Sequence, residues 1–129
     1  LRMNPRLIRR YNPYIEESEE SMAIHKMLDC STAHITRHDN ELFTEHARVA
    51  EFNPRVHDFL PVRMSPHEHG YIVFVSGKEG HADRLRAISD AGLSDAFVGL
   101  YGFAVKHDCF LINLDSDGDV IEGLPTHDW

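Results

Sequence analysis

The chain has 129 residues, which is the length of a single domain, and its 42 % hydrophobic and 26 % charged residues are typical of a folded globular protein. No apolar run approaches the roughly 18 residues of a membrane-spanning helix, and no stretch has the pattern of a secretory signal. Two cysteines are too few for a disulfide framework. These features exclude an integral membrane protein and a disulfide-rich secreted domain, and they favour a cytoplasmic location.

The formal net charge is −8, from 13 basic and 21 acidic residues, and it is unevenly distributed. Residues 1–22 carry equal numbers of Arg and Glu, so the negative excess lies in residues 23–129. The end of the chain, from residue 108, contains no Lys or Arg and six acids: Asp108, Asp115, Asp117, Asp119, Glu122 and Asp128. Because such a surface repels phosphate backbones, direct nucleic-acid binding is disfavoured, and a cation or a basic protein is the favoured partner.

The composition divides the chain into an N-terminal arm or appendage, residues 1–22, and a single α/β domain, residues 23–129. The arm combines an Arg-rich half with a Glu-rich half, and two prolines limit any helix in it. Its apolar residues would dock it on the domain: Leu7, Ile8, Tyr11 and Tyr14.

Hydrophobic periodicity predicts the elements of the domain in chain order. A strand over residues 24–30 leads to a helix over 37–50, which Thr36 and Asp39 begin with a variant of the capping box. Residues 53–69 contain three prolines and are interpreted mostly as loop, with a short strand at 60–64.

The second half of the domain is expected to contain two further helices between two apolar strands. Residues 71–76, YIVFVS, are almost continuously apolar, which is typical of a central strand buried on both faces. Helices follow over 81–91 and 95–107, and one apolar stripe marks the buried side of the second: Leu93, Phe97, Leu100, Tyr101 and Ala104. A buried strand over 110–114 and a hairpin turn to a partner strand at 120–121 complete the domain. This order predicts an α/β (α+β) fold, a mixed sheet of four to five strands with about three helices packed on it.

The first candidate site is the segment that connects the first predicted strand to the first predicted helix, Asp29-Cys30-Ser31-Thr32-Ala33-His34. Sheets with parallel strands place ligand sites at the carboxyl ends of their strands. The candidate ligand or partner contacts are therefore Asp29, Ser31, Thr32 and His34. Cys30 or Ser31 is a candidate nucleophile with His34 as its base. In the structural alternative, Ser31 and Thr32 satisfy backbone amides and Cys30 is a small core residue.

Ten histidines give a second candidate, because imidazole is the ligand that zinc and nickel commonly use. His67 and His69 would lie on one face of an extended segment, and His38 is a third candidate ligand for a zinc or nickel ion. Scattered surface histidines that bind no native metal are the alternative.

A third candidate follows the last buried strand, where Asp115, Asp117 and Asp119 alternate before and after Gly118 like the start of a calcium loop. When the loop is counted from Asn113, Gly118 is at the sixth position, and the acid needed at the twelfth position is replaced by Leu124. A structural turn closed by Asp117-Gly118 is therefore the favoured interpretation.

Two segments resemble motifs of an uncharacterised family of small bacterial proteins carried on plasmids, prophages and genomic islands. They are the opening LDCSTAHIT, residues 28–36, and an ending formed by CFLINLDSDG, residues 109–118, followed by LPTHDW, residues 124–129. The resemblance covers residues 24–129 and implies an accessory gene product near antirestriction and toxin–antitoxin functions, with no assigned activity.

Two functions are therefore considered for the chain. The preferred one is a non-enzymatic accessory protein of a mobile genetic element, which binds a host or defence protein through its acidic surface and needs no cofactor. The alternative is a small enzyme or metal-dependent protein that uses Cys30, His34 and the His67/His69 pair.

Overall fold

Four strands form one mixed sheet in the order β1-β4-β3-β2. The computed structural model describes residues 24–52 and 60–129, and all elements below lie in these ranges. β1 (Lys26–Ser31) runs parallel to β4 (Cys109–Asp115), and β4 is antiparallel to β3 (Gly70–Phe74). β2 (Met64–His67) is antiparallel to β3 and forms the far edge of the sheet. Two strands distant in sequence therefore occupy the first two positions of the sheet.

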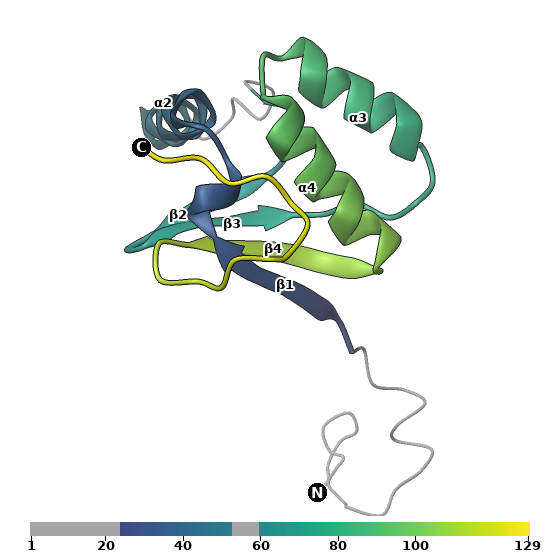
Figure 1. Ribbon diagram of the computed structural model, residues 1–129. Helices are drawn as coiled ribbons and strands as arrows, with labels where there is room; N and C mark the ends of the chain where they lie inside the picture. Colours follow the sequence, from purple (N-terminus) through teal and green to yellow (C-terminus); the bar gives the residue numbers. More distant parts are fainter. Residues whose placement is uncertain (1–23, 53–59) are drawn as a thin grey trace, which may run out of the picture.

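Three α-helices lie on one side of this sheet (Figure 1). They are α2 (Arg37–Phe52), α3 (His81–Asp90) and α4 (Asp95–Lys106), and a 3-10 turn, η1 (Thr32–His34), joins β1 to α2. The expected α+β architecture, a mixed sheet covered by three helices, is confirmed. None of the described helices is long and apolar enough to cross a membrane.

The predicted capping box at the start of α2 is present and extends to a second helix. Thr36 N–H donates to Asp39 Oδ2 at 2.9 Å, and Asp39 N–H donates to Thr36 Oγ1 at 3.1 Å. Ser94, the N-cap of α4, donates its own N–H to Asp39 Oδ1 at 2.8 Å. One buried carboxylate therefore holds the first turns of α2 and α4 together.

The core lies between the helices and the inner face of the sheet. The predicted apolar stripe of α4 is buried there, and α2 contributes Phe43, whose ring packs edge-on against Phe97 at 5.2 Å. The inner face of the sheet supplies alternate residues of its strands: Cys30, Tyr71, Val73, Ile112 and Leu114. The alternation of buried and partly exposed residues along β3 and over residues 111–115 of β4 means that only one face of the sheet is covered by helices.

This alternation corrects the expectation of strands buried on both faces. Tyr71 and Val73 are buried, whereas Ile72 and Phe74 on the opposite face are only half-buried. In this strand one face packs against the core, and the other face is also apolar but is only partly buried.

Two further expectations about strands were wrong. The short strand expected at 60–64 begins only at Met64, and Pro66 is tolerated there because β2 is an edge strand. The partner strand expected at 120–121 is not formed, because the chain after β4 crosses to the end of β1, where Asp119 O accepts the N–H of Ser31 at 2.8 Å. We call residues 119–129 the C-terminal strap.

Candidate functional site

His34 connects the opening segment of the domain to the C-terminal strap. Its ring is 1 % exposed; Nε2 accepts the N–H of Ile121 at 2.8 Å, and Nδ1 lies 2.8 Å from the carbonyl oxygen of Pro125. Since Nε2 accepts, the neutral ring carries its proton on Nδ1 and donates it to Pro125. Both ring nitrogens are therefore used to hold the strap.

The strap is bound at two more points along the same segment. His127 N–H donates to the carbonyl oxygen of Ala33 at 2.7 Å, and Trp129 Nε1 donates to that of Ile35 at 2.9 Å. The indole of Trp129 stays 42 % exposed, so it pins the tail by a hydrogen bond at its edge without full burial. The two motifs that carried the family resemblance thus form one structural unit (Figure 1).

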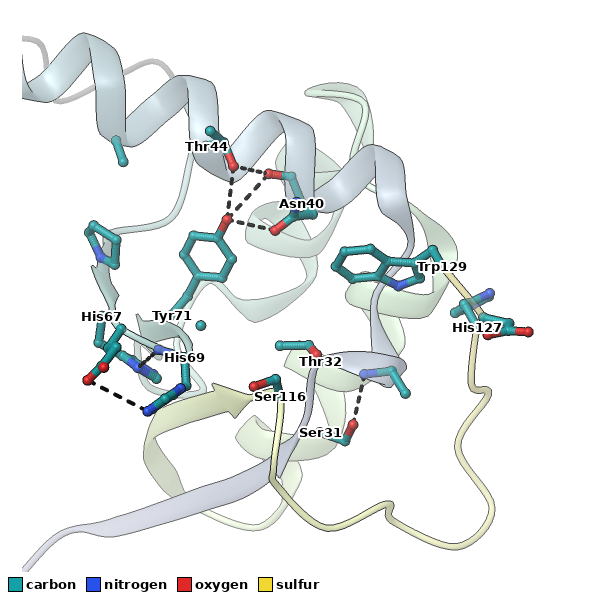
Figure 2. A pocket seen from close by; sticks show the side chains of 16 residues that line it. Ser31, Thr32, Asn40, Thr44, His67, His69, Tyr71, Ser116, His127 and Trp129 are labelled. Atoms are coloured by element: carbon teal, nitrogen blue, oxygen red, sulfur yellow. Dashed lines mark hydrogen bonds and ion pairs between the residues drawn. The ribbon is translucent and has the colours of Figure 1, made fainter.

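A pocket of about 830 Å³ opens beside this unit, which is within the usual range of ligand sites. Figure 2 shows it between α2, the turn from β2 to β3, the end of β1 and the end of the strap. Ser31 at the end of β1 and Ser116 just after β4 line its floor, so it lies at the carboxyl ends of the two parallel strands. This is where sheets with parallel strands place binding sites.

The wall formed by α2 is polar and uncharged. Tyr71 reaches it from β3, and its hydroxyl donates to Asn40 Oδ1 at 2.7 Å and lies 3.0 Å from Thr44 Oγ1. Thr44 Oγ1 in turn donates to the carbonyl oxygen of Asn40 at 2.8 Å. The network fixes the phenol and leaves a surface of neutral hydrogen-bonding groups.

The opposite wall is the turn between β2 and β3. His67 Nδ1 accepts the N–H of His69 at 3.1 Å, so Nε2 carries the proton and donates to Asn113 Oδ1 at 2.9 Å. Asn113 Nδ2 donates to Asp29 Oδ1 at 2.9 Å. This chain of hydrogen bonds crosses the sheet from β2 to β1, and it fixes the turn that carries His69 into the pocket.

The charge around the pocket is negative. Among the described residues that line it there is no Lys or Arg, whereas Glu68 and Asp128 are both exposed at it. The Glu68 side chain is 84 % exposed and lies 3.7 Å from His69 Nε2. A cation would meet neutral acceptors and carboxylates here, and an anion would meet no fixed positive charge.

The structure separates the residues of the first candidate site. Cys30 is fully buried in the core, and burial, aided by the charge of Asp29, raises the pKa of its thiol to about 12. Ser31 Oγ accepts the N–H of Ala33 at 2.9 Å, as the structural alternative proposed, and His34 binds the strap. Of this group, Ser31 and Thr32 line the pocket, and Asp29 lies on the opposite face of the sheet.

The candidate metal ligands His38, His67 and His69 are not brought together in one place. His67 and His69 line the pocket, but both nitrogens of His67 are engaged, and His38 lies near Gly92 between α3 and α4. Within residues 24–52 and 60–129, no group of three or more His, Cys, Asp or Glu side chains is arranged to hold a metal ion.

The calcium-like residues form a turn. Asp115 Oδ1 accepts the N–H of Asp117 at 2.8 Å, and its carbonyl oxygen accepts that of Gly118 at 2.9 Å. A Cβ on Gly118 would stand 2.5 Å from the carbonyl oxygen of Cys30, so glycine allows the turn to pass against β1. Asp119 begins the strap, and its backbone carbonyl oxygen accepts the N–H of Ser31. These contacts give the Asp115 side chain and Gly118 a structural role in the turn.

Sequence reasoning missed four residues that shape the site: Asn40, Thr44, Tyr71 and Asn113. Asn40 and Thr44 are four residues apart on one helix, and this spacing could have marked a polar face. Tyr71 and Asn113 lie within apolar strands, where no local signal separates them from the core.

The family comparison fits this architecture. A model described as the C-terminal domain of a family of unknown function (DUF5983) matches residues 27–129. No match was found among curated proteins or among solved structures. The match begins in β1 and ends with Trp129, so it contains the whole pocket and the strap.

Proposed function

We propose that this chain, which belongs to the DUF5983 family of unknown function, is a non-enzymatic binding module that receives a basic segment of a partner protein in the pocket beside Trp129. The observation that carries the proposal is the pocket itself. It has the volume of a ligand site and lies at the carboxyl ends of β1 and β4. Its described lining combines neutral polar groups, the imidazoles of His67, His69 and His127, and the carboxylates of Glu68 and Asp128, with no Lys or Arg.

A Lys or Arg side chain is the group that this lining suits. Carboxylates of Glu68 and Asp128 attract it, and Ser and Thr hydroxyls of the floor accept hydrogen bonds from it. The half-exposed indole of Trp129 offers a face on which a guanidinium can stack. Because both carboxylates are solvated, they contribute more to association rate and selectivity than to affinity.

The described polar groups argue for binding without catalysis. The Cys30 thiol has its pKa raised to about 12, so it forms almost no thiolate at neutral pH. Ser31 Oγ accepts one backbone N–H and keeps a second lone pair, and the rings of His34 and His67 both use their two nitrogens in structural hydrogen bonds. Because both nitrogens of His34 are engaged, Cys30 and Ser31 lack the adjacent base that would activate them as nucleophiles.

The identity of the partner follows from the resemblance to proteins of plasmids, prophages and genomic islands. In that setting, a host or defence protein with an exposed basic segment is the proposed partner. Ser116, His127 and Asp128 bring both ends of the acidic stretch 115–128 to the pocket, and the Asp128 carboxylate would meet that segment directly.

The test uses Trp129 as its reporter, because it is the single tryptophan of the chain. A short Arg- and Lys-containing peptide should change the emission of Trp129 and release heat on titration, and an acidic peptide of equal length should do neither. The double variant E68Q/D128N should weaken the basic peptide severalfold. The matched control D83N/D90N removes the same charge from α3, away from the pocket, and should bind like the parent.

Three results would overturn the proposal. They are no binding of the basic peptide, an equal loss of affinity in both double variants, or free arginine binding as tightly as the peptide. The second result would show unspecific attraction to an acidic protein, and the third would assign the pocket to a small cationic molecule.

A further inference from the structure

The face of the sheet that the helices leave uncovered carries a row of apolar side chains across three strands. Met27 on β1 pairs in register with Leu111 on β4, and Leu111 pairs with Phe74 on β3. Residues that pair across strands share a face, and this row lies opposite the buried Ile112 and Val73. Phe110 joins them where the register of β1 and β4 shifts, with its ring edge-on to that of Phe74 at 6.4 Å. We call Met27, Leu111, Phe74 and Phe110 the outer apolar row.

Two members of the outer apolar row are exposed, whereas Leu111 and Phe74 are half-buried, and the guanidinium of Arg63 lies over the Phe74 ring at 5.2 Å. Met27 is 50 % exposed and Phe110 is 42 % exposed, and Ile24, just before β1, is 80 % exposed. The next row along the strands is mostly polar, with Asp29, Asn113 and Ser65 around Ile72. The apolar surface is therefore confined to the end of the sheet where β1 begins.

Exposed apolar rows of this kind usually mark a contact surface. The continuous apolar runs of β3 and β4 are typical of strands covered on both sides, and the helices account for one side only. The sequence and the structure thus agree if a further layer covers the outer apolar row.

We propose that the segment preceding β1, residues 1–23 of the chain, supplies this layer. The described chain begins at the row itself: the ring of His25 stacks on Phe110 with centroids 4.5 Å apart. Three neighbouring strands span only about 10 Å, whereas 23 extended residues reach up to about 76 Å. The segment is therefore long enough to cross the row, and its last residue is joined to Ile24, beside the row.

The residue composition of the segment suits this role better than a second copy does. It contains Leu7, Ile8, Tyr11 and Tyr14 together with Ile15, so it offers apolar side chains without needing another molecule. Two copies would have to bring together surfaces of the same negative sign, because the excess charge lies in residues 23–129.

Methyl NMR on the full chain tests the proposal through Met27. Its methyl resonance is identified by its loss in Met27→Leu, and its broadening by a soluble nitroxide is compared with that of Val120, which is 59 % exposed. In the parent chain the Met27 methyl should broaden severalfold less than the Val120 methyls. Serine at positions 7, 8, 11 and 14 together should raise the broadening of the Met27 methyl resonance to that of the Val120 methyls. The control E16Q/E19Q, in the same segment, should leave Met27 protected.

The methyl resonances of the buried Ile112 and Leu114 report that the domain stays folded in each variant. Equal broadening of Met27 and Val120 in the parent chain would overturn the proposal, because the row would then be uncovered. Protection that survives the four serine substitutions would also overturn it. If that protection is lost on dilution, a second copy is the occupant.

Discussion

His34 and Pro125 are 91 residues apart in the sequence, and the ring of His34 donates a hydrogen bond to the carbonyl oxygen of Pro125 at 2.8 Å. The other ring nitrogen accepts from Ile121, so a single buried side chain fixes the path of the C-terminal strap. The strap in turn places Trp129 at the pocket. The chemistry proposed for the pocket therefore depends on a histidine that does not line it.

His34→Phe should destabilise the domain and loosen the strap. Phenylalanine fits a buried aromatic position but leaves the Ile121 N–H and the Pro125 carbonyl without a partner, which costs about 2–4 kcal/mol. Urea unfolding should show this loss, and the emission of Trp129 should shift to the red in the folded state. The exposed His38→Gln should change neither quantity. Unchanged stability in His34→Phe would show that the strap is held by other contacts.

The pH dependence of stability should carry a contribution from His46, which is buried on the inner side of α2. Burial lowers its pKa below the ordinary value of 6.5. Between the lowered pKa and 6.5 the unfolded chain binds a proton that the folded domain does not, so stability falls as the pH falls through this window. The slope is at most about 1.4 kcal/mol per pH unit for one proton.

Urea unfolding of His46→Leu at pH values on both sides of 6.5 isolates this term. Its stability should depend less on pH than that of the parent chain in this window. The control His38→Leu removes an exposed histidine and should keep the parent slope. Identical slopes in the parent and in His46→Leu would contradict the assignment.

Gly70 and Gly99 should respond in opposite ways to alanine. A Cβ on Gly70 would stand 1.8 Å from the carbonyl oxygen of Leu114, so β3 could not keep its pairing with β4. The loss should exceed about 3 kcal/mol or prevent folding. Gly99 lies on the exposed side of α4 with nothing within 4 Å of its Cβ position, and alanine should stabilise the helix there by about 0.5–1 kcal/mol. Thermal unfolding of the two variants compares them directly, and a folded, stable Gly70→Ala would refute the close approach of β3 and β4.

Local patterns in the sequence were sufficient for the elements that local forces form. Thr36 and Asp39 predicted the start of α2 because a capping box is complete within four residues. The stripe of Phe97, Leu100 and Tyr101 predicted the buried side of α4 because helical spacing places these residues on one face. The pairing of strands was not predicted, since the register of Met27 with Leu111 depends on contacts between the two ends of the domain.

The pocket was predicted only in position, at the end of the first strand. Ser31 and Thr32 do line it, but its walls come from α2, the β2–β3 turn and the strap, which meet only in the folded chain. His34 hydrogen-bonds to the carbonyl oxygen of Pro125, and His67 hydrogen-bonds to the side chain of Asn113. No sequence pattern distinguishes a histidine with such a structural hydrogen bond from one that binds a metal.

The two cysteines should differ sharply toward a thiol reagent, and this bears on the alternative of an enzyme. Cys109 is partly exposed, whereas Cys30 is fully buried with a pKa raised to about 12 from 9.0. Iodoacetamide at neutral pH should label Cys109 in the folded chain and reach Cys30 only after unfolding, as mass spectrometry of the peptides would show. The same burial should make the domain less stable as the pH rises above 9.0, because the unfolded thiol then loses a proton that the folded one keeps. Rapid labelling of native Cys30 would reverse both conclusions and restore it as a candidate nucleophile, and Cys109→Ser supplies the background in which that labelling is measured.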